Sequence, residues 1–254
     1  MNHTISDDHQ PSIARILASL LQADFAVMIR NRRALALGMV LPLVILMMSK
    51  RAAVLGDSFL LAESITVGLV SMAILGYSMS TARDREKGIF QRLRVTPAPS
   101  WAIMVSRITV QVTACLAMVV VVLLAGYEIE RISLPPAGYA LTVPVALVGA
   151  AVFLSIGQAL VGLIRSADTI NALGRIVYIA IIFLGLLGEA GRFGETLQTV
   201  ATWSPYGTVT TLLDGAMNAS GWTGSTWLAL VVSAAYVLAF AGIGIRWFHW
   251  NPGA

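Results

Sequence analysis

The stretch Arg85-Glu86-Lys87-Gly88-Ile89-Phe90-Gln91-Arg92-Leu93-Arg94-Val95-Thr96-Pro97 is short, strongly basic and amphipathic. Long apolar runs flank it, over residues 59–81 before it and residues 102–125 after it. Each run is long enough for a helix that crosses a bilayer, which takes about 20 consecutive apolar residues. A basic connection between two such runs is typical of a cytoplasmic loop in an integral membrane protein.

The composition of the whole chain supports the same class. Of its 254 residues 57% are hydrophobic and 12% are charged, whereas soluble domains carry about 25% charged residues. The length fits one membrane domain. The single cysteine, Cys115, lies in an apolar run, so we expect a small packing residue and no disulfide framework. The net charge of +4 matches the cytoplasmic excess of basic residues in membrane proteins, and we expect no nucleic-acid partner.

The sequence predicts an all-α integral membrane protein with six transmembrane helices. The expected spans lie near residues 34–55, 59–81, 102–125, 139–164, 170–187 and 226–245. The first is the weakest, because Lys50 and Arg51 interrupt it. The expected organisation is therefore a polar tail over residues 1–11, an amphipathic helix over residues 12–33 and a six-span domain over residues 34–254.

The basic residues indicate the orientation of these spans. With both termini in the cytoplasm, the loops place thirteen Lys and Arg residues inside and only Lys50, Arg51, Arg131 and Arg192 outside. Membrane proteins keep the excess of basic residues inside, so this is the expected topology. Lysine occurs only at positions 50 and 87, which is typical of a GC-rich bacterial genome. We therefore expect a bacterial inner-membrane protein.

Two segments outside the spans are predicted to be helical. Before the first span, Ile13, Ile16, Leu17 and Leu20 recur at helical spacing, which favours an amphipathic helix in the head-group plane; a simple membrane anchor is the alternative. Between the fifth and sixth spans, residues 189–225 are rich in interfacial aromatics, and their apolar stretch Tyr206–Met217 is too short to span. Short outer re-entrant helices are expected there, and an ordinary surface loop is the alternative.

The sequence carries no constellation of residues that indicates catalysis. Its three histidines lie near the termini, and it lacks the glycine-rich loop that cradles ATP phosphates. We therefore expect no enzymatic activity and no cofactor in this chain. Glu63 is the acidic residue inside an expected span. It is predicted either to line a translocation path or to pair with Lys50 or Arg51.

The basic stretch itself is predicted to form a helix over residues 85–95 that ends before Pro97. On that helix Ile89, Phe90 and Leu93 share one side, and basic side chains surround them. An apolar patch that faces the cytosol indicates a docked partner. The alternative is a helix that lies on the lipid surface.

The chain resembles the membrane subunit of ABC transporters of the ABC-2 family. There the loop between the second and third spans carries the pattern Glu-basic-x-Gly-x-x-x-x-Leu-x-x-x-Pro. This sequence has Glu86, Lys87, Leu93 and Pro97 in that pattern, with the glycine one place early at Gly88. Ser204-Pro205-Tyr206 with Asp214 is similar to the outer segment of the family. The arginine that usually follows this aspartate is absent here.

The resemblance implies a role for each segment. The basic stretch becomes a coupling helix seated in an ATPase subunit, and the N-terminal helix becomes a connecting helix that also touches the ATPase. The partners are two copies of that ATPase, which bind ATP and Mg, a second permease subunit, identical or paralogous, and membrane lipid. The implied coupling residues are Glu86, Lys87, Gly88, Ile89, Phe90, Arg92, Leu93 and Pro97. The residues implied at the translocation path or outer gate are Glu63, Ser204, Pro205, Tyr206 and Asp214.

The function implied is export of an amphipathic or lipid-like small molecule, such as a drug, antibiotic or lipid. Multidrug efflux and antibiotic resistance are the corresponding processes. Ile89, Phe90 and Leu93 are expected to act as knobs, and the second and third spans are expected to transmit their motion. The alternatives are a polysaccharide exporter of the same family, a scaffold or sensor that transports nothing, and an ion-coupled carrier.

Overall fold

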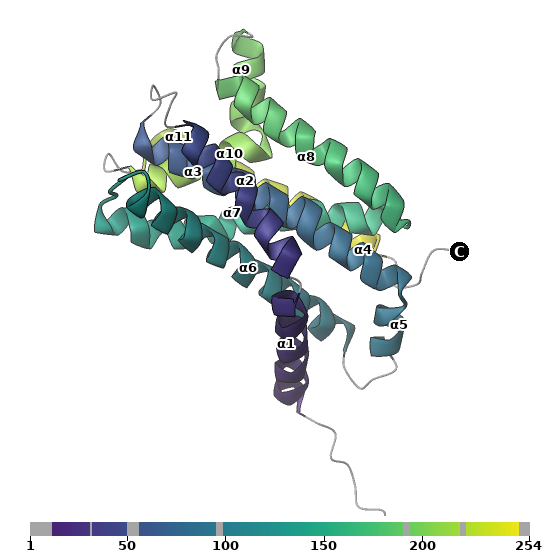
Figure 1. Cartoon of the computed structure of the whole chain (residues 1–254). Helices are drawn as coiled ribbons and strands as arrows, with labels where there is room; N and C mark the ends of the chain where they lie inside the picture. Colours follow the sequence, from purple (N-terminus) through teal and green to yellow (C-terminus); the bar gives the residue numbers. More distant parts are fainter. Residues whose placement is uncertain are drawn as a thin grey trace, which may run out of the picture.

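The computed structural model describes residues 12–30, 32–49, 56–94, 99–189, 194–218 and 222–248. In this part of the chain the regular elements are all helices (Figure 1), as predicted. In chain order they are α1 (Ile13–Arg30), α2 (Arg32–Ser49), α3 (Asp57–Val70), the π-helical segment η2 (Ser71–Tyr77), α4 (Ser78–Glu86), α5 (Ile89–Arg94), α6 (Ser100–Glu128), α7 (Pro136–Leu163), α8 (Ala167–Glu189), α9 (Glu195–Trp203), α10 (Pro205–Met217) and α11 (Gly224–Arg246).

Five helices within the described ranges are long and apolar enough to cross a membrane. They are Asp57–Glu86, Ser100–Glu128, Pro136–Leu163, Ala167–Gly188 and Gly224–Arg246. These five helices match the second to sixth expected spans; each begins two or three residues earlier than expected, and all but Pro136–Leu163 also end later. The first expected span coincides with α2, whose described apolar part is Gly38–Met48. Residues 50–55 lie outside the described part, so a sixth span stays a prediction.

The continuous helix formed by α3, η2 and α4, here called the central span, lies in the middle of the bundle (Figure 1). The other residues of the chain bury 83% of its apolar stretch, against 17% for each of α8 and α11. Every residue from Leu60 to Val70 is buried. A helix that is apolar on all sides belongs in the interior of a bundle, which explains why α2, α6, α7 and α10 surround this one.

Polar side chains join the central span to four neighbouring helices. The atom pairs are Gln111 Nε2 and Met72 O at 3.0 Å, Tyr77 Oη and Gln158 Oε1 at 2.5 Å, Ser71 Oγ and Tyr178 Oη at 3.0 Å, and Thr210 Oγ1 and Thr66 Oγ1 at 3.1 Å. Three of the four pairs involve η2. A π-helical turn is wider than an α-helical one, and here the carbonyl of Met72 accepts a hydrogen bond from a side chain. These bonds fix the rotation of the central span within the bundle.

The segment between α8 and α11 contains two short helices, so the prediction of helices there is confirmed and an ordinary loop is excluded. The Ser204 hydroxyl accepts from Gly207 N at 3.2 Å and caps α10, and Pro205 occupies the first turn. α10 packs against α3, α7 and α11 and buries Tyr206, Leu212 and others. Its entry into the bilayer remains a prediction.

Helix α1 points away from the bundle at its N-terminal half and packs against α6 (Figure 1). The predicted helix is confirmed, and Ser12 O accepts its first backbone bond from Ile16 N at 3.1 Å. Ile16, Leu17 and Leu20 are half-buried, whereas Ile13 is 57% exposed. The apolar side of α1 is therefore partly covered by the rest of the chain and partly exposed.

The contact between α7 and α11 leads to a prediction about stability. A Cβ added at Gly162 would lie 2.9 Å from the carbonyl oxygen of Gly244, whereas a Cβ at Gly242 would meet nothing within 4 Å. Gly162→Ala should lower the free energy of unfolding by about 1–3 kcal/mol, because backbone cannot move aside cheaply. The control Gly242→Ala should raise it by up to about 1 kcal/mol through helix propensity.

Thermal unfolding of both variants in detergent measures the difference. Equal midpoints for the two variants would contradict the close approach of α7 and α11.

Candidate functional site

The basic stretch is broken by a turn in the middle. Helix α4 ends at Glu86, and α5 begins at Ile89. Gly88 between them has φ +67°, a left-handed conformation that glycine adopts without strain. Its N–H donates to Arg85 O at 3.0 Å, as is common after the last turn of a helix. The prediction of one helix over residues 85–95 is therefore wrong, because Gly88 redirects the chain.

The Arg85 side chain is only 1% exposed and binds the end of α7. Nη1 donates to Val161 O at 2.8 Å, and Nη2 donates to Ile164 O at 2.6 Å and Arg165 O at 2.7 Å. The last carbonyls of a helix lack partners within the helix and carry its partial negative charge. Arg85 satisfies three carbonyls at this end with a positive charge.

The neighbouring residue binds the start of the next helix. Glu86 Oε1 accepts from Ala167 N at 2.6 Å, where α8 begins and the helix dipole is positive. Arg85 and Glu86, here called the clamp, thus hold both sides of the α7–α8 turn with charges of the matching sign. One oxygen of the exposed Glu86 carboxylate is thus bound within the chain, and its expected contact with the ATPase stays a prediction.

Phe90 is fully buried, so its predicted role as an exposed knob is wrong. The Arg107 guanidinium carbon lies 4.8 Å from the centre of its ring, a cation–π contact. The ring of Phe248, just after α11, meets it edge to face at 5.9 Å. Phe90 therefore anchors α5 to α6 and to the chain that follows α11. Ile89 is half-buried, and Pro97 and the side chain of Leu93 lie outside what the structure describes.

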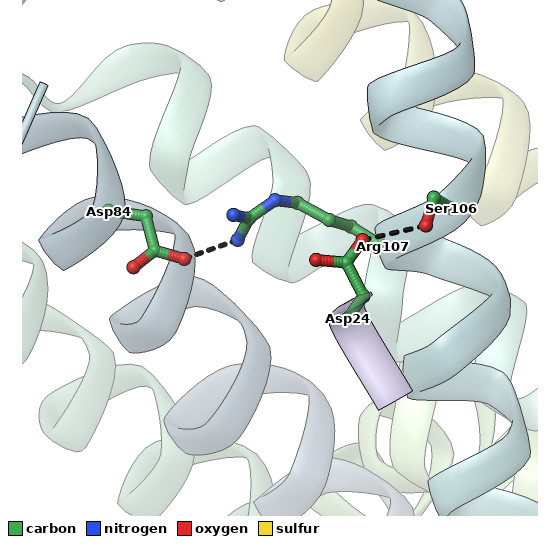
Figure 2. Close-up of polar contacts among 4 residues, drawn as sticks. All are labelled: Asp24, Asp84, Ser106 and Arg107. Carbon is green, nitrogen blue, oxygen red and sulfur yellow. Dashed lines mark hydrogen bonds and ion pairs between the residues drawn. The ribbon is translucent and has the colours of Figure 1, made fainter. Parts of the chain in front are cut away.

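Two neighbouring residues of α6 tie this region to α1 and α4. Figure 2 shows Arg107 paired with Asp84 of α4, while Ser106 Oγ donates to Asp24 Oδ2 of α1 at 2.6 Å. Asp24, Asp84 and Ser106 were not among the residues predicted from the sequence. A signal for Asp84 was present, because an arginine at the edge of an apolar run calls for a nearby acidic partner.

Several basic side chains are exposed around the turn between α4 and α5. Arg83, Lys87 and Arg92, here called the basic turn, are exposed together with Gln91. Glu86 is also exposed, but its carboxylate is bound to Ala167 N. Among the described residues of this segment, the exposed side chains are therefore mainly cationic, and Phe90 does not belong to the apolar patch that was expected there. A partner that complements these cations must present acidic groups.

The residues predicted at the other end of the bundle have different surroundings. Ser204 and Pro205 form the start of α10, and Tyr206 is buried. Asp214 Oδ1 accepts from Ser58 Oγ of α3 at 2.6 Å. Glu63 is 6% exposed and faces the interior of this chain, and Lys50 and Arg51 lie outside the described residues. A role in a translocation path or outer gate stays a prediction for Glu63, Ser204, Pro205, Tyr206 and Asp214.

A comparison with protein families adds to this geometry. The family model described as ABC-2 type transporter matches residues 16–217, which is 202 of the 254 residues. The match runs from the first turn of α1 to the end of α10, so it includes the clamp, the basic turn and the α9–α10 pair. A comparison with curated proteins finds no match.

The burial of Phe90 distinguishes a folding role from a docking role. Phe90→Ala should lower the free energy of unfolding by about 3–5 kcal/mol, because it leaves a cavity and removes the partner of Arg107. Gln91→Ala, at the exposed neighbour, should leave stability within about 0.5 kcal/mol of the wild type.

Thermal unfolding of the purified variants measures both effects. A Phe90→Ala variant as stable as Gln91→Ala would mean that the ring does not pack as described.

Proposed function

The chain belongs to the ABC-2 type transporter family, and we propose that it is the permease subunit of an exporter that moves an amphipathic or lipid-like small molecule outward. ABC-2 membrane domains are permeases and work with an ATPase, so the ATPase activity is placed in a separate subunit. The cargo class rests on the apolar character of the spans and on the short connections between them. A drug, an antibiotic or a lipid fits this class.

The proposed assembly contains two permease subunits, identical or paralogous, and two ATPase subunits that bind ATP and Mg. α2 is the first of six spans, both termini are cytoplasmic, and the membrane is the bacterial inner membrane. The uneven distribution of arginine supports this orientation, since the basic turn and the clamp lie at the same end of the central span. The ATPase subunits then meet the permease at the basic turn.

The exposed basic turn beside the clamp is the observation that carries the proposal. Lys87 and Arg92 are exposed on either side of the Gly88 break. Arg85 and Phe90, which lie two residues before Lys87 and two residues before Arg92, are buried. The segment over residues 85–92 therefore presents cations to a partner and is also attached to the bundle by buried side chains. This arrangement suits a contact through which one protein moves another.

The clamp gives that movement a route. Arg85 and Glu86 bind the α7–α8 turn through four hydrogen bonds of 2.6–2.8 Å. A push on the basic turn then reaches α8, which is among the least enclosed of the spans. At its far end α8 packs against α9 and α10. This route through α8 adds to the second and third spans, which were expected to transmit the motion. The basic turn, the clamp and α8 would then have two positions, and nucleotide bound to the ATPase would favour one of them.

Helix α1 has a second connection to the same region. Asp24 binds Ser106 of α6, and the next residue, Arg107, binds Asp84 of α4 and covers Phe90. The proposed connecting helix α1 is thereby linked through α6 to α4 and α5, the two helices that carry the basic turn. Contact of the ATPase with α1 and with the turn would therefore act on one joined unit.

A pull-down tests the proposal. The tagged chain, purified from its native membranes in a mild detergent, should bring a stoichiometric ATPase with it. Lys87→Glu and Arg92→Glu should each lose that ATPase, because they place a negative charge against an acidic surface. Arg131→Glu makes the same change at the exposed α6–α7 connection, at the opposite end of α6, and should retain it. Mass spectrometry of the eluates identifies the partners.

Two outcomes would contradict the proposal. An intact permease without any ATPase would favour a scaffold or sensor. Loss of the ATPase with Arg131→Glu but not with Lys87→Glu or Arg92→Glu would place the contact at the other end of the bundle.

A further inference from the structure

A pocket of about 210 Å³ lies at the end of the bundle opposite the basic turn. It is bounded by the start of α3, the end of α8, and helices α9 and α10. The side chains that give it chemical character are Phe59, Gln198, Thr202, Thr210, Thr211 and Asp214. Glycines and an alanine make up the rest of the lining, so the space is not filled by side chains.

The lining offers acceptor oxygens on Asp214, Thr202 and Thr210, and the Gln198 amide offers both a donor and an acceptor. Asp214 is the one charged residue among the described residues that line it. The hydroxyl of Thr202 donates to Gln198 O at 2.9 Å. The hydroxyl of Thr210 bonds Tyr206 O and Thr66 Oγ1, both at 3.1 Å. Hydroxyls whose hydrogens are used in this way present lone pairs to the pocket. A ligand should therefore bring donors and a positive charge.

Asp214 keeps acceptor capacity for such a ligand. Its Oδ1 accepts from Ser58 Oγ at 2.6 Å, and a carboxylate has about four lone-pair sites. The bond to Ser58 holds the carboxylate in place against α3. A fixed carboxylate in partly dehydrated surroundings attracts a cation more strongly than one in bulk water. The Phe59 ring adds a surface on which an organic cation is favourable.

The size of the pocket limits what enters it. Sites for whole drug-sized molecules span about 300–1,000 Å³, so 210 Å³ suits a head group. Because this volume suits only a head group, an apolar tail attached to it would extend out of the pocket.

We propose that this pocket binds the protonated amine head of an amphipathic cation. The head group contacts Asp214 and the acceptor oxygens of Thr202 and Thr210, and the tail extends out of the pocket. This inference deepens the proposed function and rests on it for the idea that the ligand is cargo. Binding to the pocket itself requires neither ATP nor the ATPase.

Thermal unfolding of the purified chain in a nonionic detergent, with octylammonium chloride as the probe, tests the proposal. A ligand that binds the folded state raises the unfolding midpoint. Octylammonium should raise it, whereas sodium octanoate, with an apolar tail of similar length and the opposite charge, should not. Ammonium chloride separates an organic cation from a small one and should have no effect. Asp214→Asn should weaken octylammonium binding by about tenfold or more, since a charge-assisted bond is lost.

Two further variants keep the test decisive. Asp57→Asn removes an exposed carboxylate from the same end of α3, outside the pocket, and should bind like the wild type. Ser58→Ala removes the internal partner of Asp214 but leaves its charge, and should bind octylammonium more weakly than the wild type but more tightly than Asp214→Asn does.

Equal shifts with octylammonium and octanoate, or an unchanged shift in Asp214→Asn, would overturn the proposal. So would loss of binding in Ser58→Ala as large as in Asp214→Asn, because the carboxylate would then be structural. Since no ATPase is present, a failure here leaves the pull-down result unaffected.

Discussion

A buried guanidinium must have partners, because an uncompensated charge in the interior of a protein is strongly destabilising. Arg85 meets this constraint with three backbone carbonyls at the end of α7. Its neighbour Glu86 binds the first amide of α8. The α4–α5 segment can therefore adopt only positions that keep the α7–α8 turn within hydrogen-bond distance. The placement of Phe90 and the exposure of the basic turn follow from this attachment.

The central span joins this attachment to the opposite end of the molecule. It is one continuous helix from Asp57 to Glu86. Ser58 in its first turn binds Asp214 in α10, and Arg85 in its last turn binds α7. The π-helical segment between these ends is held by side chains of α6, α7 and α8. π-helical turns occur often at functional sites. In this account the basic turn and the pocket at Asp214 are the two ends of one element.

The spans could be predicted from the sequence because an apolar run of sufficient length has one main use in a membrane protein. Five of the expected spans match helices of the structure, and the two short helices before α11 also match the expectation. The coupling segment could not be predicted in detail. A helical projection drawn through Gly88 assumes a continuous rotation, and the left-handed residue breaks it. That assumption placed Phe90 on an exposed face.

The partners of Arg85 and Glu86 could not be predicted from the sequence either, because of the kind of group that they are. They are backbone groups 76–81 residues away, and backbone groups leave no mark in the side-chain pattern. The pair of Arg107 and Asp84 was accessible, because both are charged residues at the edges of adjacent apolar runs. The pocket at Asp214 depends on four separate segments that meet only in the folded chain.

The central claim is that the basic turn and the start of α8 move as one unit when the ATPase binds nucleotide. Electron-paramagnetic-resonance distances test it directly, with spin labels at exposed positions of a Cys115→Ala chain in complex with its ATPase. The labels are placed in pairs at Gln91 on α5, Asp168 on α8 and Thr199 on α9. The account predicts that the Gln91–Asp168 distance is the same with and without ATP, while the distance from each to Thr199 changes. A Gln91–Asp168 distance that changes with ATP, while Asp168–Thr199 stays constant, would contradict it.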